Sequence, residues 1–553
     1  MRCFALLAAI GCGGRSSPQP EVAGDGGALG GDAEAARCDD EDAPRPCGID
    51  VGACAPGSQR CEGGAWGACL GGIAPAGESC NAEDDDCDGA IDETCPWVES
   101  AGGAGFDAAH AIAALPDGGA IVVGRFQDVA TFGAGEARET TLVSLGGDDA
   151  FVARYAPTGV LEWAVGAGGS FNDWATGVAI AGDGGVLVSG MFGGVATFGA
   201  GSRATTIVSE GEFDAFVARF EPTGAFAWVA RSSGSGAEEP ANNLAADGEG
   251  RVVIVGGFGG AARFGAGEAT DTSFESSGDG DVFVAAYDPS GALAWAVRAG
   301  GPFHDLAFDV AMSADGGVLV TGVFSETAVF GDGDAATSLT SDGLSEVFLA
   351  RLDSTGALAW AVRAGGAEDD FGRGVAATSD GGALVAGSFG GVAVFGEGDP
   401  GESALAVRGG TDAFMARYTS AGALAWAIRA GGIEDDFASG IVARKDGFLV
   451  TGGFSAIAVF GAAAAETTLD SDGGMDVFVA AYDADGVLAS VLGAGGPGGA
   501  IGYDIAALDA GGALVAGSFS DEATFFADTD VPRTITSSGA SDVFVAHYPP
   551  SPP

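Results

Sequence analysis

The chain has 553 residues, a formal net charge of −54 at pH 7, 47 % hydrophobic residues and 100 glycines. The negative charge argues against nucleic acid and anionic membrane surfaces as partners, because like charges repel. The hydrophobic content excludes a chain that is disordered throughout, and no apolar run reaches the roughly 18 residues that a membrane-spanning helix needs. Val, Phe and Ala dominate the apolar residues, which favours an all-β protein of short strands and many turns.

Residues 1–12, MRCFALLAAIGC, combine Arg2, an apolar stretch from Phe4 to Ile10, and a cysteine after a small residue. This order resembles a bacterial lipoprotein signal, which implies export and a lipid on Cys12. An ordinary secretory signal or a misplaced start codon would also explain it. Residues 13–37 are rich in Gly, Ser, Pro and Ala, which predicts a disordered tether. We therefore expect an extracytoplasmic protein, secreted or held at the outer membrane or cell surface, whose contact with the membrane is a lipid anchor.

Residues 38–96 hold eight of the ten cysteines, and none follows them. An even number of cysteines in a short segment predicts a disulfide-stapled module made in an oxidising compartment. The spacing lacks the paired CxxC units of a structural zinc site, and it leaves the disulfide connectivity open. The candidate disulfide cysteines are Cys38, Cys47, Cys54, Cys61, Cys69, Cys80, Cys87 and Cys95.

The acidic segment of this module, CNAEDDDCDGAIDETC at residues 80–95, is the best candidate for a metal site. Alternating carboxylates followed by a glycine wrap oxygen ligands around a hard cation, and calcium is the ion expected. An EF-hand would need a glutamate where Cys95 stands. The segment resembles the metal-binding motif of MopE-type bacterial surface proteins, and the alternative is a solvated acidic loop held by disulfides. The residues that match the motif are Asp84, Asp86, Asp88, Asp92 and Glu93.

Residues 97–553 repeat with a period of 65 or 66 residues. A phenylalanine ends a stretch similar to DGGxLVxGxF in every copy, and an acid-x-Phe motif follows it. Copies at so regular a spacing indicate a repeat architecture. The phenylalanines are Phe126, Phe192, Phe258, Phe324, Phe389, Phe454 and Phe519; the acids are Asp149, Asp214, Asp281, Glu346, Asp412, Asp476 and Asp542.

Each copy is predicted to form four short strands. In the second copy these are TGVAIA, VLVSGMF, DAFVARF and AFAWVAR, with a longer loop between the second and third. The turns Asp183-Gly184-Gly185 and Pro222-Thr223-Gly224 suit tight hairpins. The second strand is almost wholly apolar, as expected when other sheets cover both of its faces. Seven such sheets, each covering the next, predict a seven-bladed β-propeller.

The ring is predicted to close through its N-terminal strand. The seventh copy lacks a fourth strand, because the chain stops at Pro553. Trp97 is followed four residues later by Ala101-Gly102-Gly103, in register with the tryptophans of the other fourth strands. Residues 97 to about 100 should therefore complete the seventh blade. Residues 97–548 resemble the SBBP family of bacterial propeller repeats, which implies this fold and an extracytoplasmic setting but no single activity.

The repeated aromatic residues are expected to pack between blades, although a carbohydrate-stacking ladder is the alternative. The acid-x-Phe acids are expected to make turn or strand-end hydrogen bonds instead of a cation ring. A further set of aspartates follows the Gly-Gly of most copies and should cluster on one face, for structural hydrogen bonds or as a ligand rim. This set is Asp107, Asp173, Asp305, Asp370, Asp436 and Asp504.

The sequence holds no G-x-S-x-G, HExxH or GKS/GKT motif, and His110, His304 and His547 fall at unrelated repeat positions. We therefore expect a monomeric, non-enzymatic surface propeller that acts as a binding scaffold for an unidentified surface protein or glycan. A propeller hydrolase or lyase acting on polysaccharide is the alternative, because a fold does not decide a function.

Overall fold

The structure is a computed structural model that describes residues 44–48, 50–62, 65–75, 80, 84, 85, 87, 95–234, 240–462, 466–509, 511–527, 529 and 531–550. The chain divides into two compact units, residues 1–77 with 84–89, and residues 78–83 with 90–553. The described residues form β-strands and two single 3-10 turns, Gly201–Arg203 and Gly333–Ala335. Within these ranges no helix has the length and apolar character needed to cross a membrane.

The first unit contains two small hairpins. Strand β1 (Arg45–Cys47) pairs with β2 (Gly57–Gln59), and β3 (Cys61–Glu62) pairs with β4 (Ala65–Trp66). The disulfides Cys47–Cys69 and Cys54–Cys87 hold this unit, and Cys61 is also disulfide-bonded. The predicted disulfide-stapled module is thus confirmed for these cysteines, while Cys38 lies outside the described residues. The Cys80–Cys95 disulfide belongs to the second unit.

The second unit is built from four-stranded antiparallel sheets, as predicted. In each sheet the strands lie side by side from the innermost to the outermost. The sheets are β6 (Ala108–Ala114), β7 (Ala120–Phe132), β8 (Thr140–Tyr155), β9 (Leu161–Gly169); β10 (Asp173–Ile180), β11 (Val186–Phe198), β12 (Thr205–Phe220), β13 (Phe226–Gly234); β14 (Ala241–Ala246), β15 (Val252–Phe258), β18 (Asp281–Tyr287), β19 (Leu293–Ala299); β20 (Leu306–Met312), β21 (Val318–Phe330), β22 (Thr337–Leu352), β23 (Leu358–Gly366); β24 (Phe371–Ala377), β25 (Ala383–Phe389), β28 (Asp412–Tyr418), β29 (Leu424–Gly432); β30 (Phe437–Arg444), β31 (Gly447–Phe454), β34 (Asp476–Asp483), β35 (Leu488–Ala494); and β36 (Ala500–Ala507), β37 (Ala513–Phe519), β40 (Asp542–Tyr548), β5 (Trp97–Gly103).

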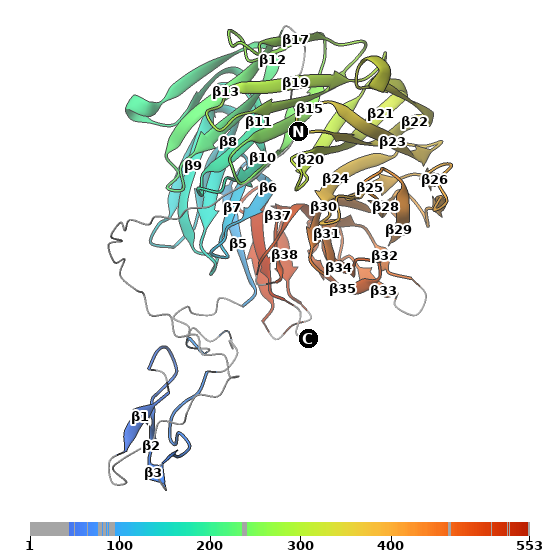
Figure 1. Ribbon diagram of the computed structural model, residues 1–553. Helices are drawn as coiled ribbons and strands as arrows, with labels where there is room; N and C mark the ends of the chain where they lie inside the picture. The colour runs from blue at the N-terminus through green and yellow to red at the C-terminus, as the bar shows by residue number, and fades with distance from the viewer. Residues whose placement is uncertain are drawn as a thin grey trace, which may run out of the picture. The chain divides into compact units, whose positions relative to one another are not determined.

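These sheets form a closed ring. The innermost strands contact one another in the order β6, β10, β14, β20, β24, β30 and β36, and β36 contacts β6 again. In Figure 1 the sheets are arranged radially around this inner circle. A ring of radially arranged four-stranded antiparallel sheets is a β-propeller, so the predicted fold class is confirmed.

The ring closes where the sequence predicted. Strand β5, from the N-terminal side, pairs with β40, from the C-terminal side, with Val543 opposite Ala101 and His547 opposite Trp97. The imidazole Nδ1 of His547 also lies 2.9 Å from the carbonyl oxygen of Cys95, so β40 contacts the residues on both sides of Pro96. One sheet is therefore assembled from the two ends of the propeller sequence.

Each hydrophobic core lies between one sheet and the next. One cluster, for example, joins Phe126 and Tyr155 of one sheet to Leu514 and Val543 of its neighbour. The repeated phenylalanines are at most 1 % exposed, which confirms their predicted packing role. Most indole N–H groups of the outermost strands donate to carbonyl groups in a turn of the following sheet: Trp97 to Pro157, Trp163 to Pro222, Trp295 to Ser354, Trp360 to Ser420 and Trp426 to Ala484. The indole nitrogen of Trp228 is buried without a hydrogen-bond partner among the described residues.

The segment predicted as a loop between the second and third strands is instead a hairpin arm. In some sheets both strands simply run on into it, as in β11 and β12, where Thr197 lies opposite Thr206. In others the arm is a separate hairpin: β16 (Ala261–Phe264) with β17 (Thr272–Glu275), β26 (Val392–Phe395) with β27 (Ser403–Ala406), β32 (Ile457–Phe460) with β33 (Thr467–Asp470), and β38 (Glu522–Phe525) with β39 (Arg533–Thr536). The Thr and Val residues in these segments favour strand over loop.

Each arm pairs with the outermost strand of the preceding sheet. The pairs are β7 with β5, β11 with β9, β16 with β13, β26 with β23 and β32 with β29, and single bridges join Gly300 to Val329 and Gly495 to Thr524. An unpaired outer strand would expose backbone donors and acceptors to other chains. The arm covers part of this edge and joins neighbouring sheets by main-chain hydrogen bonds.

The second glycine of each Gly-Gly motif lies at this junction. A Cβ atom on Gly103 would overlap the carbonyl oxygen of Val129, and a Cβ atom on Gly432 would overlap that of Ile457. The same overlap recurs at Gly169, Gly301 and Gly366. The glycine is therefore required by the close approach of the next arm.

We predict that Gly432→Ala lowers the free energy of unfolding by about 1–3 kcal/mol, because the added methyl group must displace backbone. Gly248→Ala is the matched control, since a Cβ atom there meets nothing within 4 Å, and its effect should stay within about 0.5 kcal/mol. Denaturant unfolding of both variants measures the difference. Equal losses in the two variants would contradict the proposed crowding at the junction.

Candidate functional site

Every innermost strand carries a β-bulge at the same place. At each bulge one residue of the innermost strand has no partner on the second strand, so this residue is left out of the ladder of paired residues. These residues are chemically unlike one another, although the positions around them are mostly Ala and Gly. They are His110, Thr176, Asn242, Phe308, Arg373, Ser439 and Tyr503.

The bulge residues line one pocket between the innermost strands, with a volume of about 320 Å³. Trp174, Asn243, Asp309, Gly440 and Asp504 complete its lining. We call it the axial pocket. Its volume lies at the small end of the roughly 300–1,000 Å³ that is usual for small-molecule sites.

Four of the bulge side chains are engaged in holding neighbouring sheets together. His110 Nδ1 lies 2.9 Å from the carbonyl oxygen of Ala175, and because a carbonyl only accepts, Nδ1 carries the hydrogen. Thr176, Asn242 and Ser439 likewise donate to a carbonyl of the next sheet, at Ala241, Ala307 and Gly502. Burial lowers the pKa of His110 to about 4, so this side chain is neutral at neutral pH.

The other three bulge side chains, Phe308, Arg373 and Tyr503, form no such bond among the described residues. The Arg373 Nε atom is buried without a hydrogen-bond partner. The guanidinium carbon lies 5.1 Å from the centre of the Phe371 ring and 5.3 Å from that of Phe437. Burial lowers the pKa of Arg373. These three bulge side chains are therefore not committed to a neighbouring sheet.

The two carboxylates of the pocket take part in the junctions between sheets. Asp309 accepts bonds from Asn243 Nδ2 at 2.6 Å and from the backbone N–H of Val375 at 2.6 Å. Asp504 accepts one from the backbone N–H of Ile112 at 2.9 Å. Burial raises the pKa of Asp309 to about 7 and that of Asp504 to about 6.

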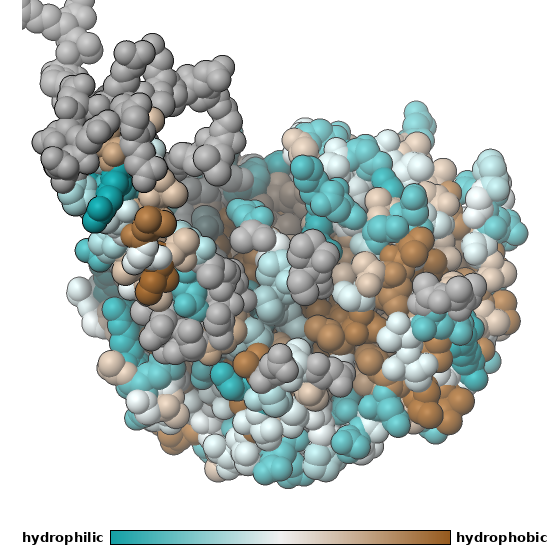
Figure 2. All heavy atoms as spheres, turned by 90° about the horizontal axis from the view of Figure 1, so that it is seen from below, coloured by the Kyte–Doolittle hydropathy of each residue, from teal (hydrophilic) through white to brown (hydrophobic). Residues whose placement is uncertain are grey.

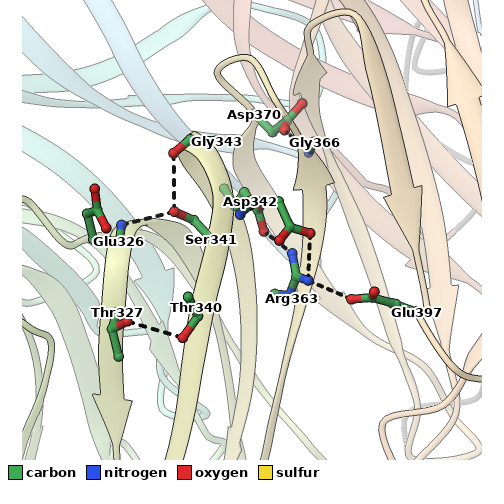
Figure 3. Close-up of polar contacts among 11 residues, drawn as sticks. Glu326, Thr327, Thr340, Ser341, Asp342, Gly343, Arg363, Gly366, Asp370 and Glu397 are labelled. Carbon is green, nitrogen blue, oxygen red and sulfur yellow. Dashed lines mark hydrogen bonds and ion pairs between the residues drawn. The ribbon is translucent and has the colours of Figure 1, made fainter.

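The acid-x-Phe acids all make the same turn hydrogen bond. Each carboxylate accepts from the backbone N–H four residues earlier, as Glu346 does from Asp342 at 2.6 Å. Glu346 also pairs with Arg363, which is held by Asp342 and Glu397 as well (Figure 3). Each acid thus makes the expected turn hydrogen bond. A second carboxylate oxygen, Oδ1, is buried without a hydrogen-bond partner in the described part of the chain in Asp149, Asp214, Asp281, Asp412 and Asp542.

The aspartates after Gly-Gly make a second repeated bond. Asp370 accepts from the backbone N–H of Gly366 at 2.7 Å (Figure 3), and Asp107, Asp173, Asp305 and Asp436 make the equivalent bond. Asp504 does not belong with them. It follows the bulge of its strand, as Asp309 does, so its grouping with this set was wrong by a few residues of register.

Of the predicted calcium ligands, the structure describes Asp84, which is 5 % exposed and whose carbonyl accepts from the backbone N–H of Ala53 at 2.9 Å. Asp86, Asp88, Asp92 and Glu93, like the lipidation candidate Cys12, lie outside the described residues. Within the described part of the chain, no group of three or more His, Cys, Asp or Glu side chains could hold a metal ion.

The axial pocket was missed in the sequence. Its signal in the sequence is one position of the repeat, where unlike residues stand in an otherwise uniform strand. This position is the middle residue of AHA, ATG, ANN, AFD, GRG, ASG and GYD in successive copies. Such variation within a repeat marks a position that the fold does not dictate.

No family model matches the chain, so its likeness to SBBP and MopE-type sequences stays an interpretation of the sequence. A stretch of 173 residues, 31 % of the chain, is 34 % identical to regulatory protein FlaEY of Caulobacter vibrioides. A stretch of 155 residues, 27 % of the chain, is 28 % identical to an uncharacterized WD repeat-containing protein of Acanthamoeba polyphaga mimivirus. The matches span 17 % and 11 % of these two relatives.

Solved structures with some likeness include Sqt1 from Chaetomium thermophilum, at 11 % identity and a TM-score of 0.34, covering 80 % of this chain and all of that one. The Pan2 WD40 domain of Neurospora crassa matches at 10 % identity and a TM-score of 0.29, covering 68 % and 90 %. AztD from Citrobacter koseri matches at 10 % identity and a TM-score of 0.28, covering 72 % and 96 %. The assignment as a β-propeller rests on the strand pairing described above.

We predict that the propeller becomes more stable as the pH falls from 8 to 5. Burial raises the pKa of Asp173, Asp305 and Asp370 to about 7, so between pH 4 and 7 the folded state binds protons that the unfolded state does not. Stability therefore falls as the pH rises through this window. His110 and His547, whose pKa values burial lowers, oppose the trend but are outnumbered.

Thermal unfolding at constant ionic strength measures this effect. The midpoint should be higher at pH 5 than at pH 8, and Asp173→Asn should reduce the difference because it removes one of the titrating groups. A midpoint that falls steadily on acidification would contradict the prediction.

Proposed function

We propose that this protein is an exported binding scaffold, a β-propeller of seven blades that takes its ligand in the axial pocket. The observation that carries the proposal is the variation among the bulge residues of the innermost strands. The other repeated positions carry similar residues in every sheet, whereas the bulge residues differ from sheet to sheet and line one pocket. Three of them, Phe308, Arg373 and Tyr503, make no hydrogen bond to the next sheet within the described ranges. The order of contacts around the inner ring supports the count of seven.

We prefer binding to polysaccharide hydrolysis because both carboxylates of the axial pocket already accept hydrogen bonds from neighbouring sheets. A hydrolase of the usual kind needs one carboxyl group as acid and a second as base or nucleophile. The raised pKa of Asp309, about 7, would suit an acid. Its oxygens, however, already accept bonds from Asn243 and Val375, and Asp504 is engaged with Ile112, which supports a structural role for both.

The disulfides indicate an extracytoplasmic protein, because such bonds persist in oxidising compartments. We further propose that Cys12 carries a lipid that holds the protein at the outer membrane or cell surface. The partner is a surface protein or a glycan. A protein partner would suit the large apolar side chains that are exposed in the loops after Gly-Gly. These are Phe106, Phe171 and Phe303. Figure 2 shows one face on which hydrophilic residues lie between smaller apolar patches.

The test is native mass spectrometry of the full protein after incubation with cell-envelope extract. We expect a bound species that Tyr503→Ala removes, because Tyr503 lines the pocket. Val392→Ala, an exposed arm position outside the pocket lining, is the control and should retain the species. Loss with Phe106→Ala alone would place binding on the outer loops, and release of shortened glycans by the wild type would favour the hydrolase.

We also propose that the acidic loop at residues 80–95 binds calcium. The burial of Asp84 supports this, because a buried carboxylate gains from a nearby cation. Titration calorimetry on the full chain should detect a site with a Kd of about 10⁻⁴ to 10⁻³ M, the range of extracellular calcium modules. Asp86→Ala with Asp88→Ala should abolish it and Asp50→Ala should not. Unchanged binding in the double variant would leave the loop a solvated acidic turn.

A further inference from the structure

Arg373 is the positively charged residue of the axial pocket. Among the residues that line the pocket it is the one arginine, no lysine accompanies it, and His110 is neutral at neutral pH. The rings of Phe371 and Phe437 flank its guanidinium group. The site therefore holds a half-buried cation, with its Nε atom buried and its surroundings aromatic.

This arginine differs from the arginines on the outermost strands. Arg298, Arg363 and Arg429 each form an ion pair with the acid-x-Phe acid of the adjacent strand, at 2.7, 2.8 and 3.1 Å. Arg373 pairs with no carboxylate among the described residues, and its Nε atom has no partner. A buried charge is costly unless it is paired and hydrogen-bonded. An anion in the pocket would remove that cost.

A carboxylate is the anion that the guanidinium fits best in so small a site, because its two oxygens match the planar fork of N–H donors. The remaining polar groups of the pocket are mostly acceptors. Asn242 uses one of its two amide N–H groups for Ala307 and keeps its Oδ1 as an acceptor, and the carboxylates of Asp309 and Asp504 keep further lone pairs. Such groups accept hydrogen bonds from hydroxyl groups.

The walls of the pocket include the rings of Phe308, Tyr503 and Trp174. Aromatic faces of this kind pack against the C–H face of a sugar ring or against another flat ring. A volume of about 320 Å³ limits the ligand to roughly one such ring with its substituents.

We propose that the axial pocket binds a small carboxylate that also carries hydroxyl groups, such as a uronic acid, with its carboxylate on Arg373. This inference rests on the proposed function, since it names the chemical class of the ligand for the same pocket. A free sugar acid and the terminal residue of an acidic glycan share this chemistry, and the experiment separates them.

The experiment is isothermal titration calorimetry of the full chain with sodium D-glucuronate, D-glucose and inorganic phosphate, each in a separate titration. We expect glucuronate to bind at least tenfold more tightly than glucose or phosphate. Arg373→Gln should weaken glucuronate at least tenfold. Arg138→Gln removes the same charge from an exposed loop position and should change the affinity less than twofold. Circular dichroism and the thermal midpoint establish that both variants are folded.

A glucuronate-terminated oligosaccharide is titrated alongside free glucuronate. Tighter binding of the oligosaccharide would identify the end of an acidic glycan as the source of the carboxylate, and tighter binding of free glucuronate would identify a free sugar acid. If Arg373→Gln does not fold, Arg373→Lys replaces it, because lysine keeps the charge but loses the planar fork; glucuronate binding as tight as in the wild type would then overturn the proposal. Equal affinities for glucuronate, glucose and phosphate, or no glucuronate binding by the wild type, would also overturn it. The scaffold function would survive these results if the species from envelope extract still depended on Tyr503.

Discussion

The structure depends on the main-chain pairing between the outermost strand of each sheet and the arm of the next. This pairing covers an edge that would otherwise present free backbone donors and acceptors, and it recurs around the ring. It also explains the Gly-Gly motif, because the approaching carbonyl leaves no room for a Cβ atom at Gly103 or Gly432. The buried phenylalanines fill the space between sheets, but the junction sets how closely neighbouring sheets approach.

The same repetition leaves one position of each sheet free to vary. A bulge frees its residue from the ladder, and around the ring these residues converge on one pocket. Where the residue is His, Thr, Asn or Ser it holds the next sheet, and where it is Phe, Arg or Tyr it does not. In the three sheets where the bulge residue does not hold the next sheet, its chemistry can differ at little cost to the fold, which is a reason to place the function of this propeller in its axis.

The repeat spacing was enough to predict the strands, the closure through Trp97 and the packing of the phenylalanines, because each follows from a periodic pattern of apolar residues and turns. The arms were predicted as loops, although the two strands of each arm pair with each other, as Thr197 does with Thr206. Their second partner lies in the preceding sheet, as Gly168 does for Thr197, and a repeat pattern does not reveal a contact between copies. The axial pocket could not be predicted, because the residues that build it, such as Phe308 and Arg373, are alike in position and not in chemistry. The register error at Asp504 arose because the seventh copy has Ala500 where the other copies have their aspartate, so the next acid along the chain, beside the bulge of that strand, was taken in its place.

Amide hydrogen exchange of β5 is the measurement that tests the closed ring most directly. Strand β5 occupies in its sheet the place that β19 and β29 occupy in theirs, so the amides of Val98 to Ala101 should exchange as slowly as those of these two strands. Fast exchange confined to β5, with the other outermost strands protected, would show that the ring is open at its junction and would contradict the account given above.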